Sequence, residues 1–241
     1  MNRDIQAIFL DVGNTLRVLE KDEAHRARAR QQLAQLVGVA ESPEAFCERL
    51  DTRYKTYRKW AFDTLNEASE KELWTRWLLP DLPADQVAAL SDDLTFQYRQ
   101  SMGRREMVRD AKRVVIELDR RGYTLGIISN VITEREIPEW LKQDGLDRYF
   151  KAVLLSSVFG RRKPDPAIFL EAARRAGVAP VHSAYVGDNP LRDVEGTRRA
   201  GFGMSIILID PAELAKEPIA DENKPDAIIH EFGELLTVFP A

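Results

Sequence analysis

The hydrophobic positions follow two patterns that divide the chain into two kinds of region. Residues 7–10 form a continuous apolar run that stops at Asp11, which is typical of a central strand buried on both faces. From residue 17 to residue 105 the pattern changes to long charged segments in which apolar residues recur at helical spacing. The sequence Ser42-Pro43-Glu44 opens one of these segments with a capping hydroxyl and a proline at the first helical position. Residues 17–105 are therefore predicted to form an all-helical insert.

After residue 105 helical and strand patterns alternate. Five further strands are predicted by apolar runs at residues 124–128, 152–155, 184–186, 205–209 and 226–229. Such alternation is typical of a mainly parallel sheet with helices on both faces. The chain is thus predicted to be an α/β protein with a doubly wound sheet. Residues 1–16 and 106–241 would form its core domain, and residues 17–105 would form the inserted domain.

The composition limits the partners and the location of the protein. Its 241 residues include 35 basic and 39 acidic side chains, which gives a formal net charge of −4. Because there is no overall positive charge, neither nucleic acid nor an anionic membrane is expected as the main partner. The amino-terminal residues lack the pattern of a signal peptide or a membrane span, and the single Cys47 cannot form an internal disulfide. These features predict a cytoplasmic location.

Polar residues stand after several of the predicted strands. In an open α/β sheet, ligands bind beyond the carboxyl ends of the strands. The residues at such positions are Asp11, Ser129, Asn130, Lys163, Asp188 and Asp193. Each one alone also fits an ordinary role, such as a turn residue or a helix cap. Their occurrence after four different strands predicts a shared site at one end of the sheet.

The acidic residues of this set are suited to phosphoryl chemistry. The Asp11 carboxylate can attack phosphorus and form an aspartyl-phosphate, which divides one difficult hydrolysis into two easier displacements. Mg²⁺ prefers oxygen ligands and usually takes one or two carboxylates together with water and substrate phosphate. The predicted Mg²⁺ ligands are Asp11, Asp188 and the carbonyl oxygen of Gly13, and Asp193 is expected to support them.

The remaining residues of the set offer hydrogen-bond donors and a positive charge. A phosphoryl group in transfer spreads negative charge over its oxygens, and hydroxyl, amide and ammonium groups stabilise that charge. Ser129, Asn130 and Lys163 are therefore predicted to bind phosphate. Lys163 would also keep neighbouring carboxylates ionised. The sequence Asp165-Pro166 predicts a helix that begins just after this lysine.

Four short sequences carry a resemblance to a known family. They are FLDVGNTL at residues 9–16, IISN at 127–130, RKPDPAIF at 162–169 and VGDNPLRDVEGTRRAG at 186–201. In order and spacing they resemble the four motifs of the haloacid dehalogenase superfamily. The resemblance implies a Rossmann-like core with a helical first-position cap between the first two motifs. It also implies that Asp11 is the nucleophile, Ser129 a phosphate ligand, Lys163 the charge-balancing lysine and Asp188 the metal carboxylate, with Asp193 in support.

Gly13 departs from that family pattern. Phosphatases of the superfamily carry a second Asp at this position, which acts as general acid and base. The predicted function is a Mg²⁺-dependent phosphatase that acts on a small phosphorylated metabolite through Asp11. One alternative is a dehalogenase-type carbon–halogen hydrolase, since such members lack the second Asp, although the metal-binding form of the motif around Asp188 disfavours it. The other alternative is a non-catalytic or regulatory module that binds phosphate and Mg²⁺.

Overall fold

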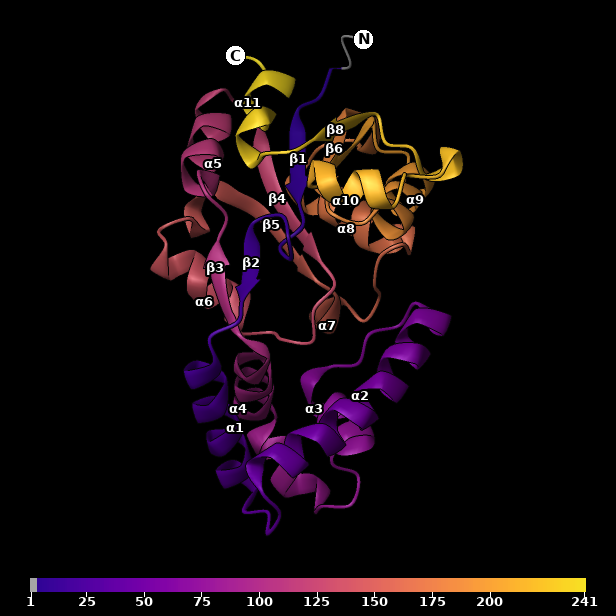
Figure 1. Cartoon of the computed structure of the whole chain (residues 1–241). Coiled ribbons are helices and arrows are strands. Elements are labelled where there is room, and N and C mark those ends of the chain that lie inside the picture. The colour runs from indigo at the N-terminus through magenta and orange to yellow at the C-terminus, as the bar shows by residue number, and fades with distance from the viewer. Residues whose placement is uncertain (1–3) are drawn as a thin grey trace.

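A single parallel sheet forms the centre of the protein in the computed structural model, which describes residues 4–241 (Figure 1). Its strands are β1 (Ala7–Leu10), β4 (Thr124–Ser129), β5 (Phe150–Leu155), β6 (Ser183–Gly187), β7 (Met204–Leu208) and β8 (Ala227–Ile229). The order across the sheet is β5-β4-β1-β6-β7-β8, and every neighbouring pair is parallel. The prediction of a doubly wound sheet is confirmed, and the first strand is central.

Helices cover both faces of this sheet. They are α5 (Ala111–Arg120), α6 (Glu136–Gln143), α7 (Ser156–Phe159), α8 (Pro166–Ala176), α9 (Glu195–Arg199), α10 (Pro211–Lys216) and α11 (Leu235–Val238). Alternate residues of β1 serve the two faces, since Ile8 belongs to one apolar cluster and Phe9 to the other. Both are fully buried, which explains why the strand reads as a continuous apolar run.

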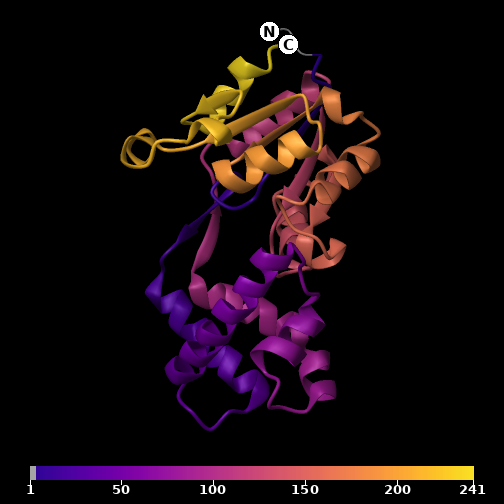
Figure 2. The ribbon, with the colours of Figure 1, turned by 90° about the vertical axis from the view of Figure 1, so that its right-hand side faces the viewer.

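The insert forms a helical body with an apolar cluster of its own, beyond the carboxyl ends of the strands (Figures 1 and 2). It contains α1 (Glu23–Val37), α2 (Pro43–Thr64), α3 (Glu70–Glu72), a π-helical segment at Leu73–Leu78 and α4 (Ala84–Met102). Helix α2 starts as its sequence predicts, because the Ser42 side chain accepts a hydrogen bond from the Ala45 N–H. Within residues 4–241, no helix combines the length and the apolar character needed to cross a bilayer.

The prediction that residues 17–105 are helical throughout is wrong at both ends. Strands β2 (Arg17–Glu20) and β3 (Arg104–Met107) pair in antiparallel fashion and form a ribbon between the sheet and the insert. Each strand has four residues, and neither shows an alternation of buried and exposed positions that would mark it in the sequence. The proposed domain boundaries, at residues 16 and 105, fall at this ribbon.

Candidate active site

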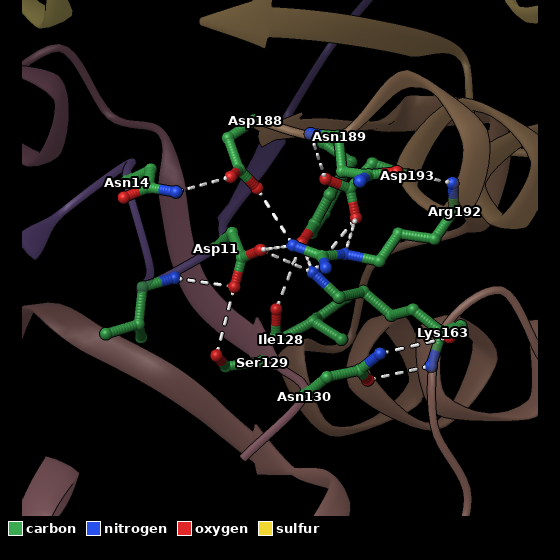
Figure 3. Close-up of polar contacts among 12 residues, drawn as sticks. Asp11, Asn14, Ile128, Ser129, Asn130, Lys163, Asp188, Asn189, Arg192 and Asp193 are labelled. Atoms are coloured by element: carbon green, nitrogen blue, oxygen red, sulfur yellow. Dashed lines mark hydrogen bonds and ion pairs between the residues drawn. The ribbon is translucent and has the colours of Figure 1, made fainter. Parts of the chain in front are cut away.

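The predicted site residues meet at the carboxyl edge of three neighbouring strands (Figure 3). Asp11 directly follows β1, Ser129 ends β4, and Asp188 directly follows β6. Lys163 reaches the same place from the loop between α7 and α8. The helix that begins after the lysine is the predicted one, because the Asp165 side chain accepts from the Ala167 N–H at 2.9 Å and α8 starts at the following proline. The fold thus brings these four side chains together.

Asp11 lies at the centre of the contacts. Its Oδ1 accepts hydrogen bonds from the Val12 N–H at 2.7 Å and from the Ser129 hydroxyl at 3.0 Å. Its Oδ2 accepts from Lys163 Nζ at 2.7 Å and lies 3.4 Å from Arg192 Nη2. Burial alone would raise the pKa of Asp11, but the charges of Lys163 and Arg192 hold that pKa below its usual value. The carboxylate is therefore ionised, which a role as nucleophile would require.

The Lys163 ammonium is fully buried and is held by several partners. Besides Asp11, its Nζ lies 3.0 Å from Asp193 Oδ1 and donates a hydrogen bond to the Tyr185 hydroxyl. Tyr185 in turn donates to the carbonyl oxygen of Ile128 at 3.0 Å. Because a buried charge requires charged or polar partners, this arrangement fixes the ammonium between two carboxylates. Tyr185 was not identified from the sequence, where it appears only as a core residue of a strand.

The side chain of Asn130 holds the main chain of Lys163. Its Oδ1 accepts from the Lys163 backbone N–H at 2.8 Å, and its Nδ2 donates to the Lys163 carbonyl oxygen at 3.0 Å. Both polar atoms of the side chain are thus engaged by the main chain of Lys163. Asn130 therefore positions the lysine. Its role in binding phosphate stays a prediction.

Three carboxylates could hold a divalent cation. One oxygen from each of Asp11, Asp188 and Asp193 lies within 4.8 Å of the others. Asp193 is buried, and its Oδ2 accepts a hydrogen bond from the Asn189 N–H at 3.0 Å. Burial raises the pKa of Asp193; the Lys163 charge lowers this pKa and the Asp11 charge raises it further. Gly187 is required for this packing, since a Cβ there would lie 2.2 Å from Asp193 Oδ2. The donor set consists of oxygens and fits Mg²⁺.

Arg192 occupies the space between these carboxylates, and the sequence did not identify it as a site residue. Its Nη2 lies 2.9 Å from Asp188 Oδ1, and its Nε lies 3.5 Å from Asp193 Oδ1 (Figure 3). Burial alone would lower the pKa of Arg192, but the three carboxylates raise it. Arg192 lies in the helical segment Pro190–Val194, whereas Asp188 precedes the cap residue Asn189, so the sequence alone showed no clear sign that the two side chains meet.

A small cavity opens in front of Asp11. Its volume is about 220 Å³, and its lining includes Gly13, Asn14, Ser129 and Asn130 from the core. The insert contributes Arg99 to the same lining. Asn14 also holds Asp188 in place, since its Nδ2 donates to Asp188 Oδ2 at 2.9 Å. The cavity therefore lies between core and insert and gives a small ligand access to the carboxylate.

Comparison with known families agrees with this geometry. The family described as haloacid dehalogenase-like hydrolase matches residues 52–207. The chain belongs to the haloacid dehalogenase-like hydrolases. The matched residues include Ser129, Lys163 and Asp188 but begin after Asp11, which follows β1. The resemblance seen in the four motifs is thereby confirmed, and the chain is a hydrolase by family.

Individual relatives of this haloacid dehalogenase-like hydrolase match along nearly its whole length. It is 28% identical to a glyceraldehyde 3-phosphate phosphatase from Methanopyrus kandleri over 239 residues, with 97% of each chain covered. It is also 28% identical to a phosphoserine phosphatase from Thermus thermophilus over 263 residues, covering 98% of this chain and 99% of the relative. Among solved structures, a 2-haloacid dehalogenase from Pseudomonas syringae shares the fold with a TM-score of 0.68, at 24% identity and 97% coverage of both chains.

Proposed function

We propose that the protein is a Mg²⁺-dependent phosphatase that hydrolyses a small phosphorylated metabolite through an aspartyl-phosphate at Asp11. The observation that carries this proposal is the ionised, buried Asp11 carboxylate at 2.7 Å from the Lys163 ammonium, with Asp188 beside it. Three relatives that match over nearly the full chain bear the names of phosphatases, which supports phosphorus rather than carbon as the atom attacked.

The reaction proceeds in two displacements at phosphorus. An oxygen of Asp11 forms a bond to phosphorus while the bond to the alcohol oxygen of the substrate breaks, and the departing alkoxide takes a proton from water. A water molecule then attacks the same phosphorus, which releases inorganic phosphate and restores the carboxylate. Lys163 holds Asp11 in its ionised form, and the Ser129 hydroxyl, now 3.0 Å from Asp11 Oδ1, can turn to a phosphoryl oxygen.

Asp11, Asp188 and the Gly13 carbonyl are the residues that would hold Mg²⁺. The bound ion supplies positive charge that neutralises the phosphoryl oxygens. Asp193 supports the site by holding Lys163 and by accepting from the Asn189 N–H. Gly13 offers no acid to protonate the leaving alcohol, so we expect the fastest turnover with esters whose alcohols are good leaving groups.

Phosphate release from a panel of phosphoesters, with Mg²⁺ and with chelator, tests the proposal. We expect release that requires Mg²⁺ and that falls to background in Asp11→Asn, a variant of nearly the same size and shape. Equal rates for the two proteins would contradict the assignment of Asp11.

The same protein preparations distinguish the two alternatives. Halide release from 2-haloacids in the presence of chelator would indicate a dehalogenase. The observation that favours this alternative is Gly13, since dehalogenase-type members lack the second Asp. A melting temperature that rises with Mg²⁺ and phosphate, without turnover of any ester, would indicate a binding module. Cytoplasmic location stays a prediction from the sequence.

A further inference from the structure

The cavity in front of Asp11 is rich in arginine on the side that faces the insert. The arginines that line it are Arg17, Arg99, Arg105 and Arg192. Asp11 is the acidic side chain among the described residues of its lining. Arg192 is already engaged by the carboxylates of the core, so the other three determine the charge of the insert side.

Arg17 is balanced and fixed. Its Nη2 lies 2.5 Å from Asp144 Oδ2, its Nη1 donates to the Arg105 carbonyl oxygen at 2.7 Å, and its guanidinium carbon lies 4.0 Å from the ring centre of Trp140. These contacts hold the guanidinium in one plane against the aromatic ring. Arg17 therefore forms a wall of the cavity and leaves little charge for a ligand.

Arg99 and Arg105 share one carboxylate. Arg99 Nε donates to Glu136, and Arg105 Nη1 lies 3.8 Å from the other oxygen of the same side chain. Arg105 Nη1 is also held by the Arg99 carbonyl oxygen at 3.0 Å. Burial and the charge of Arg99 lower the pKa of Arg105 to about 10. Two cations with a single anionic partner, on the wall of a cavity, leave a positive charge that an anion from outside would neutralise.

We propose that Arg99 and Arg105 bind a second anionic group of the substrate, such as a carboxylate, while its phosphate contacts Asp11. This assignment rests on the proposed phosphatase function and adds the class of substrate to it. A cavity of about 220 Å³ is smaller than the pockets of about 300–1,000 Å³ that hold drug-sized ligands. The substrate is thus a short phosphoester that carries an anion a few bonds from its phosphate.

The chain offers a matched control beside the residue to be changed. Arg104 and Arg105 are neighbours on β3, and successive side chains of a strand point to opposite faces. The Arg104 side chain is 57% exposed and pairs with Glu106 at 2.6 Å, and it does not line the cavity. Arg105→Gln and Arg104→Gln therefore remove the same charge from the two faces of one strand.

A kinetic comparison uses two short phosphoesters, phosphoglycolate and 2-hydroxyethyl phosphate, which differ in carrying a carboxylate or a neutral hydroxyl. For the unchanged protein we expect a KM at least about tenfold lower for phosphoglycolate, the gain of a well-placed charged contact. Arg105→Gln should remove this preference. Arg104→Gln should retain the preference and leave the kcat for 2-hydroxyethyl phosphate within about twofold, because its side chain does not line the cavity. Equal KM values for the two esters in the unchanged protein would overturn the proposal.

A binding measurement separates failure of this inference from failure of the proposed function. Calorimetric titration with phosphonoacetate and with ethylphosphonate, in excess Mg²⁺, does not depend on turnover. Tighter binding of phosphonoacetate, by about tenfold, that is lost in Arg105→Gln would support the anion site even if no ester were hydrolysed. Equal affinities would overturn it even in an active phosphatase. Arg105→Lys, which keeps the charge, should retain part of the preference and covers the case in which Arg105→Gln fails to fold.

Discussion

The groups of side chains on the two sides of the cavity carry opposite net charge, although Asp11 is the acidic residue among the described ones that line it. On the core side three carboxylates, those of Asp11, Asp188 and Asp193, meet two cations, Lys163 and Arg192. On the insert side the arginines at positions 99 and 105 meet the single carboxylate of residue 136. The core side thus has room for a further cation and the insert side for a further anion. A doubly anionic phosphoester with Mg²⁺ would complete both.

The two sides also differ in how their residues are held. On the core side, Asp11 and Asp188 follow strands, whereas Lys163 comes from a loop and Asp193 from a helical segment. Asp11, Lys163 and Asp193 are buried, and the lysine pairs with both carboxylates. The arginines of the insert side come from the end of α4 and from β3, which join the insert to the sheet. We infer that the sheet determines the chemistry, whereas the ribbon and insert determine which substrate is accepted.

Removal of the buried Lys163 ammonium should have the largest effect on the stability and the activity of the core side. Lys163→Met leaves Asp11 and Asp193 without their shared partner, and breaking a buried ion pair costs about 3–5 kcal/mol. We expect urea denaturation to show a loss of that size in the free energy of unfolding, and phosphate release to fall to background. Lys151→Met, which changes an exposed lysine on β5, should alter stability by less than about 0.5 kcal/mol. Equal stability of the two variants would contradict the shared ion pair.

A carboxyl group introduced at position 13 would test whether the core side lacks a general acid. Gly13→Asp supplies an acid where phosphatases of this superfamily carry one, and no atom outside its neighbours lies within 4 Å of a Cβ at this position. We expect phosphate release to increase by up to about 10²-fold, the lower range for positioned proton transfer. Gly13→Ala is the control for the side chain alone and should not increase the rate. A rate that stays unchanged in a folded Gly13→Asp protein would show that leaving-group protonation is not limiting.

A substitution of Arg192 tests whether its guanidinium competes with Mg²⁺ for the carboxylates of the core side. Its guanidinium pairs with Asp188, so a Mg²⁺ ion bound at the proposed site would compete with it for that carboxylate. Arg192→Ala should tighten Mg²⁺ binding by about tenfold in calorimetry, an effect of about 1.4 kcal/mol. Arg199→Ala removes an exposed arginine that also pairs with an acidic residue four positions earlier and should leave the affinity unchanged. Weaker Mg²⁺ binding in Arg192→Ala would show that the guanidinium helps to hold the site together.

The core could be predicted from the sequence because its signals are local. Each strand of the sheet reads as an apolar run, and Asp11, Ser129 and Asp188 stand at the ends of such runs. The ribbon could not be predicted, since its two short strands are polar and pair only when the chain leaves and re-enters the core.

Contacts made through the tertiary fold were also beyond the sequence. The side chain of Asn130 follows a strand like the other site residues, yet it binds the main chain of Lys163, which only the folded loop brings near. Arg105 reaches the cavity because the antiparallel register sets it opposite Leu19 of β2. Such residues carry no local signal of their own.

The contact between insert and core should respond to pH through Glu70. Its carboxylate accepts from the Glu134 N–H at 2.8 Å, and burial, together with the charges of Asp92 and Glu134, raises its pKa to about 7. Because the folded-state pKa lies above the unfolded value, the stability that protonated Glu70 contributes is full in acid and is lost as pH rises through about 7. Between pH 5 and pH 8 we expect the unchanged protein to lose about 1–2 kcal/mol relative to Glu70→Gln, which keeps the acceptor and cannot ionise.

Urea denaturation at several pH values measures this difference between the Glu70 protein and its Gln variant. Glu72→Gln is the matched control, because that side chain lies in the same short helix and is 43% exposed, where water screens its charge. It should follow the unchanged protein at every pH. If the stability of Glu70→Gln also matched that of the unchanged protein at every pH, Glu70 would be ionised in the folded state across this range. The contact between insert and core at Glu70 would then not depend on pH.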